Sequence, residues 1–265
     1  MPRLTSDDAE IVYEVLGSGP PVVLLHPFPV NHEFWMSSAQ PLASNYRLIL
    51  PDLRGHGDSG IGEGPATMAK HAADVARVCD QEGVGRAVFV GVSIGGYLLF
   101  EFWRRYPGRI AALGLCNTKA QAETPESRAA RLQSAADVLE RGVEPFIETM
   151  IPRVFGKTTI ETRPDLVANA RRMMLKMSPM DINLVQQGMA ERPDSVATLK
   201  TINVPTLLLA GAEDVATPVA EAELMRQNIS GAEMKVIARA GHYAAFEQAE
   251  EVGRVLRQFL DKVRT

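Results

Sequence analysis

The sequence predicts a doubly wound α/β fold: a mostly parallel sheet with an inserted helical cap. Short apolar runs recur along the chain, amphipathic segments separate most of them, and one long stretch holds helical segments alone. The chain has 265 residues, of which 46% are hydrophobic and 23% charged. A chain of this size and composition can bury a full core without metals or disulfides.

Five short segments are apolar on both faces, as expected of strands buried in a parallel sheet. They cover residues 21–26, 47–51, 87–93, 110–117 and 205–211, and a sixth strand is expected at 234–238. Helical patterns lie between them at 67–82 and 94–106. Another helix is expected from about Pro218, with Thr217 as its cap, and a last one over 247–263. Strands that alternate with helices in this way indicate a doubly wound sheet.

Residues 119–199 break this alternation, because charged helical segments follow one another there without a convincing strand. We interpret 119–199 as a helical cap, and residues 1–118 together with 200–265 as the core domain. The cap holds six of the eleven methionines: Met150, Met173, Met174, Met177, Met180 and Met189. Flexible thioethers suit a pocket for varied apolar groups, although packing between cap helices is the simpler interpretation.

The segment Gly91-Val92-Ser93-Ile94-Gly95 is a GxSxG motif with an apolar strand before it and a helix after it. Such a strand-to-helix turn holds a serine in a strained conformation with its hydroxyl exposed, and small residues at both ends let strand and helix approach. Ser93 is therefore the candidate nucleophile. A glycine-rich turn with an ordinary serine is the alternative.

A serine hydroxyl needs a base, and the chain has five histidines. His242 is the strongest candidate, because it lies on a predicted loop between the last strand and the last helix. His26 and His56 are interpreted as hydrogen-bonding scaffold residues, and His32 and His71 have no supporting context.

The acid that orients the histidine is assigned to Asp214, which follows the strand at 205–211 at the edge where open sheets display their sites. Neighbouring Glu213 is the rival. Asp52 also follows a strand, but its glycine-rich surroundings favour a structured turn. The chain order Ser93, Asp214, His242 differs from the orders of chymotrypsin and subtilisin.

Two backbone amides are needed to stabilise an oxyanion. Ile94 supplies one at the start of the helix after Ser93. Phe28 is our choice for the second, because it lies between Pro27 and Pro29, which have no N–H.

These segments resemble the α/β-hydrolase superfamily, in the branch of small cap-bearing esterases and lactonases that includes 3-oxoadipate enol-lactonase-like proteins. The similarity rests on HPFP at 26–29, DLRGHGDS, GVSIGG, Asn117-Thr118, VPTLLLAGAEDVATP and AGHYAAFEQAEEV. The family usually has glycine where this chain has Pro27, which changes the freedom of the oxyanion loop. The resemblance implies a carboxylate-bearing substrate, for which Arg128, Arg131, Arg153, Arg171 and Arg172 are candidate ligands, although solvated helix faces explain these arginines equally well.

The sequence thus predicts a serine hydrolase that cleaves a small carboxylic ester or lactone through an acyl-enzyme on Ser93. Carbon–carbon bond hydrolases, perhydrolases and thioesterases with the same triad are alternatives, as is a non-catalytic small-ligand receptor of the same fold. Ser93 argues against dehalogenases and epoxide hydrolases of this fold, which use an aspartate nucleophile. No cofactor or metal is implied.

The bulk properties exclude other classes of partner. The formal net charge is −4, which gives no general basic field for nucleic acid. No run of 18 apolar residues occurs, so we expect neither a signal peptide nor a membrane span, and a cytoplasmic location. Cys79 and Cys116 lie far apart without metal or redox spacing and are expected to be buried thiols.

Overall fold

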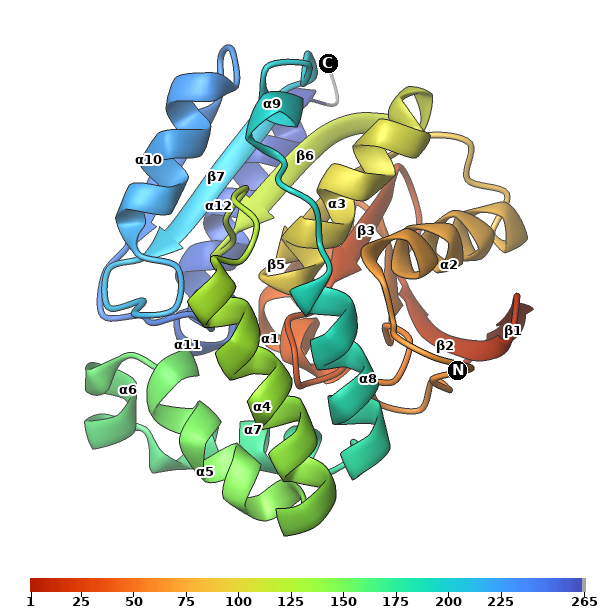
Figure 1. Ribbon diagram of the computed structural model, residues 1–265. Coiled ribbons are helices and arrows are strands. Elements are labelled where there is room, and N and C mark those ends of the chain that lie inside the picture. Colours follow the sequence, from red (N-terminus) through yellow and green to blue (C-terminus); the bar gives the residue numbers. More distant parts are fainter. Residues whose placement is uncertain (264–265) are drawn as a thin grey trace.

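An eight-stranded sheet runs through the computed structural model, which describes residues 1–263 (Figure 1). The strands are β1 (Arg3–Ser6), β2 (Ala9–Leu16), β3 (Pro21–Leu25), β4 (Arg47–Pro51), β5 (Ala87–Val92), β6 (Ile110–Cys116), β7 (Thr206–Gly211) and β8 (Glu233–Ile237). Their order in the sheet is β1-β2-β4-β3-β5-β6-β7-β8. From β4 to β8 all neighbours are parallel, whereas β1 and β2 pair antiparallel. This confirms the predicted fold class, and both ends of each predicted strand lie within one residue of the observed ends.

The hairpin of β1 and β2 was not predicted. In β2, Ala9, Ile11 and Tyr13 are buried while Glu10 is exposed, so the strand alternates between a core face and a solvent face. A search for runs that are apolar on both faces passes over such a strand. Within the part of the chain that the structure describes, β1 and β8 form the two edges of the sheet.

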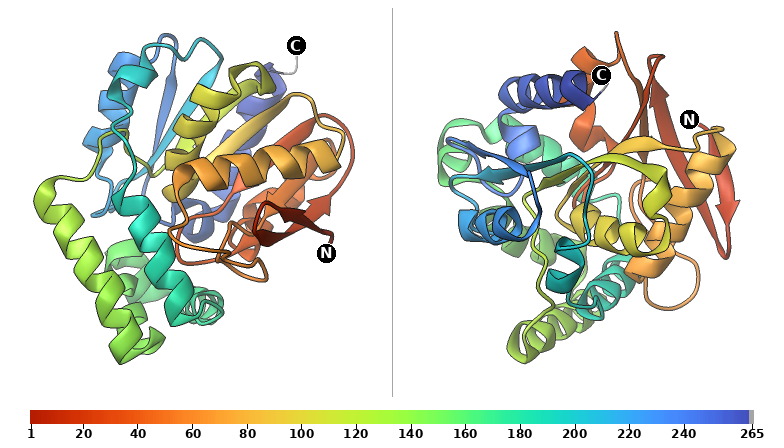
Figure 2. Two further views of the ribbon diagram at one scale, coloured as in Figure 1. Left: turned by 45° about the vertical axis from the view of Figure 1, so that its right-hand side comes forward. Right: turned by 90° about the horizontal axis from the view of Figure 1, so that it is seen from above.

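Helices cover both faces of the sheet (Figure 2). On one face lie α2 (Met68–Gln81), α3 (Ile94–Arg105) and α10 (Val219–Asn228), and on the other α1 (Met36–Ala39) and α12 (Ala249–Val263). A short helix, α11 (Ala244–Glu247), precedes α12, and the three short 3-10 helices are His32–Trp35, Gln40–Leu42 and Pro107–Arg109. The predicted cap of α10 was wrong: the helix begins after Pro218, and the Thr217 side chain bonds elsewhere.

Between β6 and β7 the chain forms a layer of helices beyond the carboxyl ends of the strands (Figure 1). The layer consists of α4 (Pro125–Arg141), α5 (Val143–Val154), α6 (Lys157–Thr162), α7 (Pro164–Met174) and α8 (Pro179–Ala190). A further helix, α9 (Val196–Leu199), lies against α10 at the far end of the molecule. The division of the chain into a core and a cap at residues 119 and 199 stays a prediction.

Both cysteines are buried and free, as expected. Burial raises the pKa of the Cys79 thiol to about 12 and raises the pKa of Cys116 as well. Neither thiol is therefore ionised near neutral pH. None of the described helices combines the length and the apolar character that a membrane span requires.

Candidate active site

Ser93 lies at the junction of β5 and α3 in a conformation that L-residues rarely adopt, with φ 55° and ψ −114°. Backbone contacts hold it there: its amide donates to the Cys116 carbonyl at 3.1 Å, and its own carbonyl accepts from the Thr118 hydroxyl at 2.9 Å. A Cβ on Gly91 would lie 2.4 Å from the Gly95 carbonyl carbon, so strand and helix meet too closely for a side chain. The strained turn therefore holds Ser93 at the carboxyl edge of the sheet.

His242 and Asp214 come together at the same edge, from the loops after β8 and β7. The Nδ1 atom of His242 lies 2.9 Å from Oδ2 of Asp214. Burial opposes ionisation of Asp214, but His242 and the hydrogen bonds from Thr217 lower the pKa of this carboxyl to about 2. An ionised Asp214 fixes the proton of His242 on Nδ1, which leaves Nε2 free to accept a proton.

Two residues that were not predicted as site residues complete the surroundings of Asp214. The Thr217 hydroxyl donates to Oδ2 at 2.6 Å, and Asn117 Nδ2 donates to the same oxygen at 2.9 Å. Asn117 also donates to the Gly241 carbonyl at 3.2 Å, next to His242. Its position directly after β6, with φ 43°, places it at the site edge. That position is the signal that would have identified it.

The rival residues have other partners. Glu213 accepts from the amide and hydroxyl of Thr158 in α6, at 2.9 and 2.5 Å. Asp52 accepts from the amides of His32 and Asp58 and from the His32 ring, which ties a loop together. Glu213 and Asp52 therefore hold local structure, and neither is among the described residues that line the cavity with Ser93.

The other histidines are parts of the scaffold. His26 Nε2 accepts from the Leu53 amide at 2.9 Å, and burial lowers the pKa of its ring to about 3. Burial also lowers the pKa of His56 to about 4 and that of His71 well below its usual value. Among the described residues that line the cavity with Ser93, the histidine is His242.

The two predicted oxyanion amides have no protein partner within residues 1–263: that of Ile94, which follows Ser93, and that of Phe28, which lines the same cavity as Ser93. Ile94 begins α3, so its amide belongs to the positive end of the helix. The Phe28 carbonyl accepts from the Tyr243 hydroxyl at 3.0 Å, which anchors the loop between Pro27 and Pro29. Both amides remain available to a ligand.

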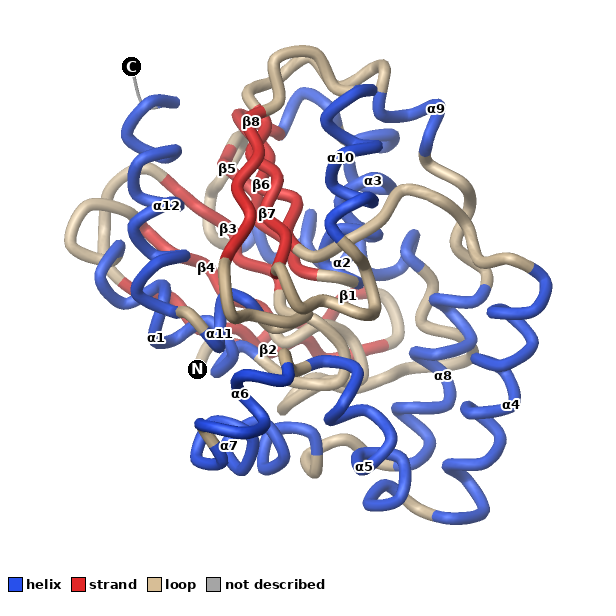
Figure 3. Tube along the Cα trace, turned by 90° about the vertical axis from the view of Figure 1, so that its left-hand side faces the viewer, coloured by secondary structure: helices blue, strands red, loops and turns tan. Residues whose placement is uncertain are grey.

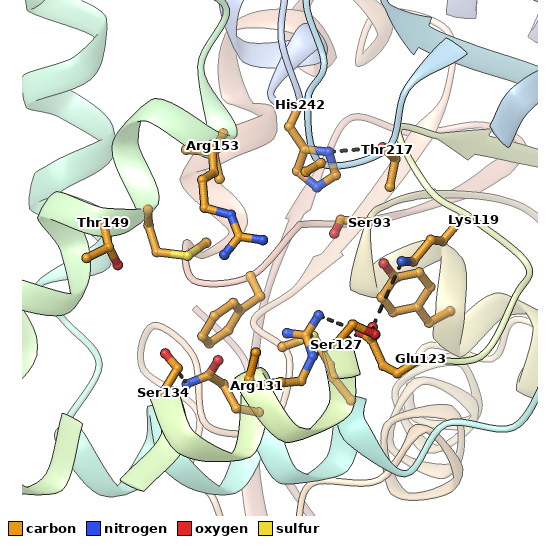
Figure 4. A pocket seen from close by; sticks show the side chains of 18 residues that line it. Ser93, Lys119, Glu123, Ser127, Arg131, Ser134, Thr149, Arg153, Thr217 and His242 are labelled. Atoms are coloured by element: carbon orange, nitrogen blue, oxygen red, sulfur yellow. Dashed lines mark hydrogen bonds and ion pairs between the residues drawn. The ribbon is translucent and has the colours of Figure 1, made fainter. Parts of the chain in front are cut away.

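A cavity of about 250 Å³ contains Ser93 and His242 and extends under the cap (Figure 4). The Met150 and Met189 thioethers line it, whereas the other cap methionines do not; Met173, Met174 and Met177 are buried in the core and Met180 is exposed. Helix α4 contributes polar groups to the wall, including Ser127 and Ser134. The cavity is thus small and has a mixed polar and apolar lining.

Three cationic side chains face this cavity: Lys119, Arg131 and Arg153. The single carboxylate there, Glu123, accepts from Arg131 at 2.7 Å and from the buried Arg192 at 2.7 Å, and lies 4.0 Å from Lys119. Arg153 has neither a hydrogen bond nor an ion pair to any described residue, and Figure 4 shows its guanidinium directed into the cavity. The cavity therefore carries surplus positive charge.

The other predicted arginines point elsewhere. Arg128 donates to the Ala190 carbonyl, Arg171 pairs with Glu148, and Arg172 donates to Asn169. Lys119 was not predicted, although it follows the Asn117-Thr118 pair at the carboxyl edge of the sheet.

Comparison with known proteins gives a consistent family. The α/β-hydrolase fold family model matches residues 20–249. A thermophilic esterase from Thermogutta terrifontis, solved with malate bound, is 37% identical over all of both chains, with a TM-score of 0.97. The enol-lactonase from Burkholderia xenovorans LB400 is 26% identical, with a TM-score of 0.91 over 98% of this chain and 100% of its own.

A similar relative is found among curated sequences. The 3-oxoadipate enol-lactonase 2 of Acinetobacter baylyi is 27% identical over 249 residues, which is 93% of this chain and 91% of that protein. The family model covers most of the chain, and the structural similarity extends over the cap as well as the sheet. The chain belongs to the α/β-hydrolase fold family.

Proposed function

We propose that this protein is a serine hydrolase that cleaves a small carboxylic ester or lactone through an acyl-enzyme on Ser93. The observation that carries the proposal is that Ser93, on a strained turn, lines one cavity with His242, whose ring is paired with Asp214. The esterase and enol-lactonase relatives support ester or lactone bonds as the target.

The mechanism follows from the positions of these groups. His242 takes the proton of Ser93 through Nε2 as the hydroxyl attacks the carbonyl carbon, and Asp214 stabilises the imidazolium that forms. The Phe28 and Ile94 amides donate to the oxyanion. His242 then protonates the leaving alkoxide, and water, deprotonated by the same ring, releases the acyl group from Ser93.

A fluorophosphonate probe tests this proposal. We expect covalent labelling of Ser93, located by peptide mass spectrometry, together with turnover of para-nitrophenyl esters by the same preparation. Labelling without turnover over a broad panel of esters and lactones would favour the receptor alternative. No labelling at Ser93 would contradict the proposed nucleophile.

The surplus positive charge further favours a substrate that carries a carboxylate. The cavity is smaller than those that hold drug-sized ligands, so the substrate is a short molecule. Arg153 is the unpaired cation in this cavity and therefore the residue that we assign to the carboxylate. The Thermogutta terrifontis esterase was solved with malate bound, and malate is a dicarboxylate, which supports a carboxylate-bearing substrate class.

Replacement of Arg153 by Met tests the substrate class. The charge-assisted hydrogen bond to a carboxylate contributes about 1.5–3 kcal/mol, so kcat/KM for para-nitrophenyl hemisuccinate should fall roughly ten- to hundredfold. The kcat/KM for the neutral para-nitrophenyl butyrate should change less than threefold, which is roughly the effect of losing a contact at the rim of a binding site. Arg172→Met is the matched control, since Arg172 bonds to Asn169 outside the cavity. Equal losses on both esters would contradict the role of Arg153.

A further inference from the structure

The cap meets the loop of His242 backbone against backbone. A Cβ on Gly241 would lie 2.2 Å from the Gly156 nitrogen and 2.5 Å from the Phe155 carbonyl carbon. The Tyr243 amide donates to the Val154 carbonyl at 3.0 Å. No side chain therefore separates the end of α5 from the residues on either side of His242.

Glu247 bridges this contact with both of its oxygens. Oε1 accepts from the Gly241 amide at 2.8 Å, and Oε2 accepts from the Gly156 amide at 2.9 Å. The residue is 4% exposed and has no cationic partner within residues 1–263, so neutral donors alone compensate its burial. These donors include the Thr159 hydroxyl of α6, and burial still raises the pKa of the carboxyl. Figure 3 shows α11, which ends at Glu247, beside α6.

Each partner of Glu247 stands next to a part of the site. Gly241 immediately precedes His242, whereas Gly156 follows Arg153 and Val154, which line the cavity. A movement of Gly241 thus reaches His242 over one residue of backbone, and a movement of Gly156 reaches Arg153 over three. Arrangements of this kind matter because small misplacements of catalytic groups cost large factors in rate.

We propose that Glu247 is a positioning residue that places His242 and the Arg153 wall of the cap relative to each other. The proposal rests on the proposed function, because it takes His242 as the base. The buried carboxyl group of Glu247 sets two distances at once: the distance from His242 to Ser93, and the distance from the cap wall to the reacting carbonyl.

Glu213 provides a matched comparison on the same interface. Its side chain also binds the cap, but its partners are the amide and hydroxyl of Thr158 alone. Loss of its charge should loosen the cap and leave His242 in place. A comparison of variants at the two glutamates therefore distinguishes an effect on the position of the cap from an effect on the position of His242.

The experiment compares E247Q and E213Q with the wild type on para-nitrophenyl butyrate and with the fluorophosphonate probe. An amide at residue 247 turns one acceptor into a donor that faces an N–H group. We expect kcat and the rate of Ser93 labelling to fall about a hundredfold in E247Q. In E213Q, KM should rise while kcat and labelling stay within roughly threefold. Circular dichroism and thermal unfolding show whether both variants are folded.

A second variant covers the case in which E247Q does not fold. A Cβ at residue 156 would lie 2.8 Å from the Gly241 nitrogen and 2.5 Å from Glu213 Oε2, so G156A forces apart Gly156 and Gly241, the two residues that Glu247 bridges, and keeps the Glu247 carboxyl. It should show the same joint loss in kcat and labelling. Wild-type kinetics in G156A, or equal kinetics in E247Q and E213Q, would overturn the positioning role. A wild type that the probe does not label at Ser93 would instead overturn the proposed function and this inference with it.

Discussion

Ser93→Ala should abolish ester hydrolysis and leave the fold intact. The substitution removes one oxygen atom, while the backbone contacts to Cys116 and Thr118 that hold the turn involve main-chain atoms of residue 93. Loss of a serine nucleophile lowers kcat by roughly 10⁵-fold or more in serine hydrolases, and the remaining activity comes from the oxyanion amides and from binding. Steady-state kinetics on para-nitrophenyl butyrate measures the loss.

The control for this variant is structural. Thermal unfolding of Ser93→Ala should follow that of the wild type within a few degrees, because the hydroxyl lines the cavity and its loss leaves the backbone contacts of the turn in place. Undiminished hydrolysis by a folded Ser93→Ala protein would disprove the acyl-enzyme mechanism.

Asp214→Asn should have the second-largest effect, with kcat lower by about 10⁴-fold. An asparagine amide can donate to Nδ1 of His242, which places the proton of the ring on Nε2 and prevents it from acting as a base. The amide also brings a donor toward Asn117 and Thr217, which now donate to the same oxygen. Kinetics of Asp214→Asn beside Glu213→Gln measures this effect, and a smaller loss of kcat in Asp214→Asn than in Glu213→Gln would reverse our assignment of the acid.

The effect of this substitution on stability depends on pH in a defined direction, because only the wild type carries the titrating carboxyl. The pKa of Asp214 is about 2, against an ordinary value of 3.8. A carboxyl whose pKa is lower in the folded state stabilises the protein at every pH above its pKa in the unfolded state. This stabilisation disappears as the pH falls through the pKa of the folded state. The difference in the free energy of unfolding between wild type and Asp214→Asn should therefore narrow as the pH falls from about 4 toward 2.

The sheet and the positions of Ser93, Asp214 and His242 close to strand ends could be predicted because their signals are local. A buried parallel strand appears in the sequence as a short apolar run, and the candidate residues lie within a few positions of a strand end. The structure brings Asp214 and His242 into contact and places Ser93 on the same cavity, although the chain separates Ser93 and Asp214 by more than a hundred residues.

The remaining features depend on contacts that are distant in sequence. Thr217 carried the local pattern of a helix cap, but the helix begins one residue later, after Pro218, and the Thr217 hydroxyl donates to Asp214 instead. Glu247 looked like an ordinary charged residue at the start of the last helix, and its burial follows from the approach of the cap. Of five candidate arginines, Arg131 and Arg153 reach the cavity, because helix packing decides which face of α4 and α5 points inward.

The two edges of the sheet have a consequence for how the molecules behave when concentrated. Unpaired strand edges offer backbone groups to other chains and so promote aggregation. One edge here is the four-residue β1, which is too short to template a partner well, and the other is β8, where Glu233 and Lys235 are exposed. The unpredicted hairpin therefore does more than extend the sheet: it covers β4, a mostly buried and apolar strand, which would otherwise be the strand available for pairing between chains.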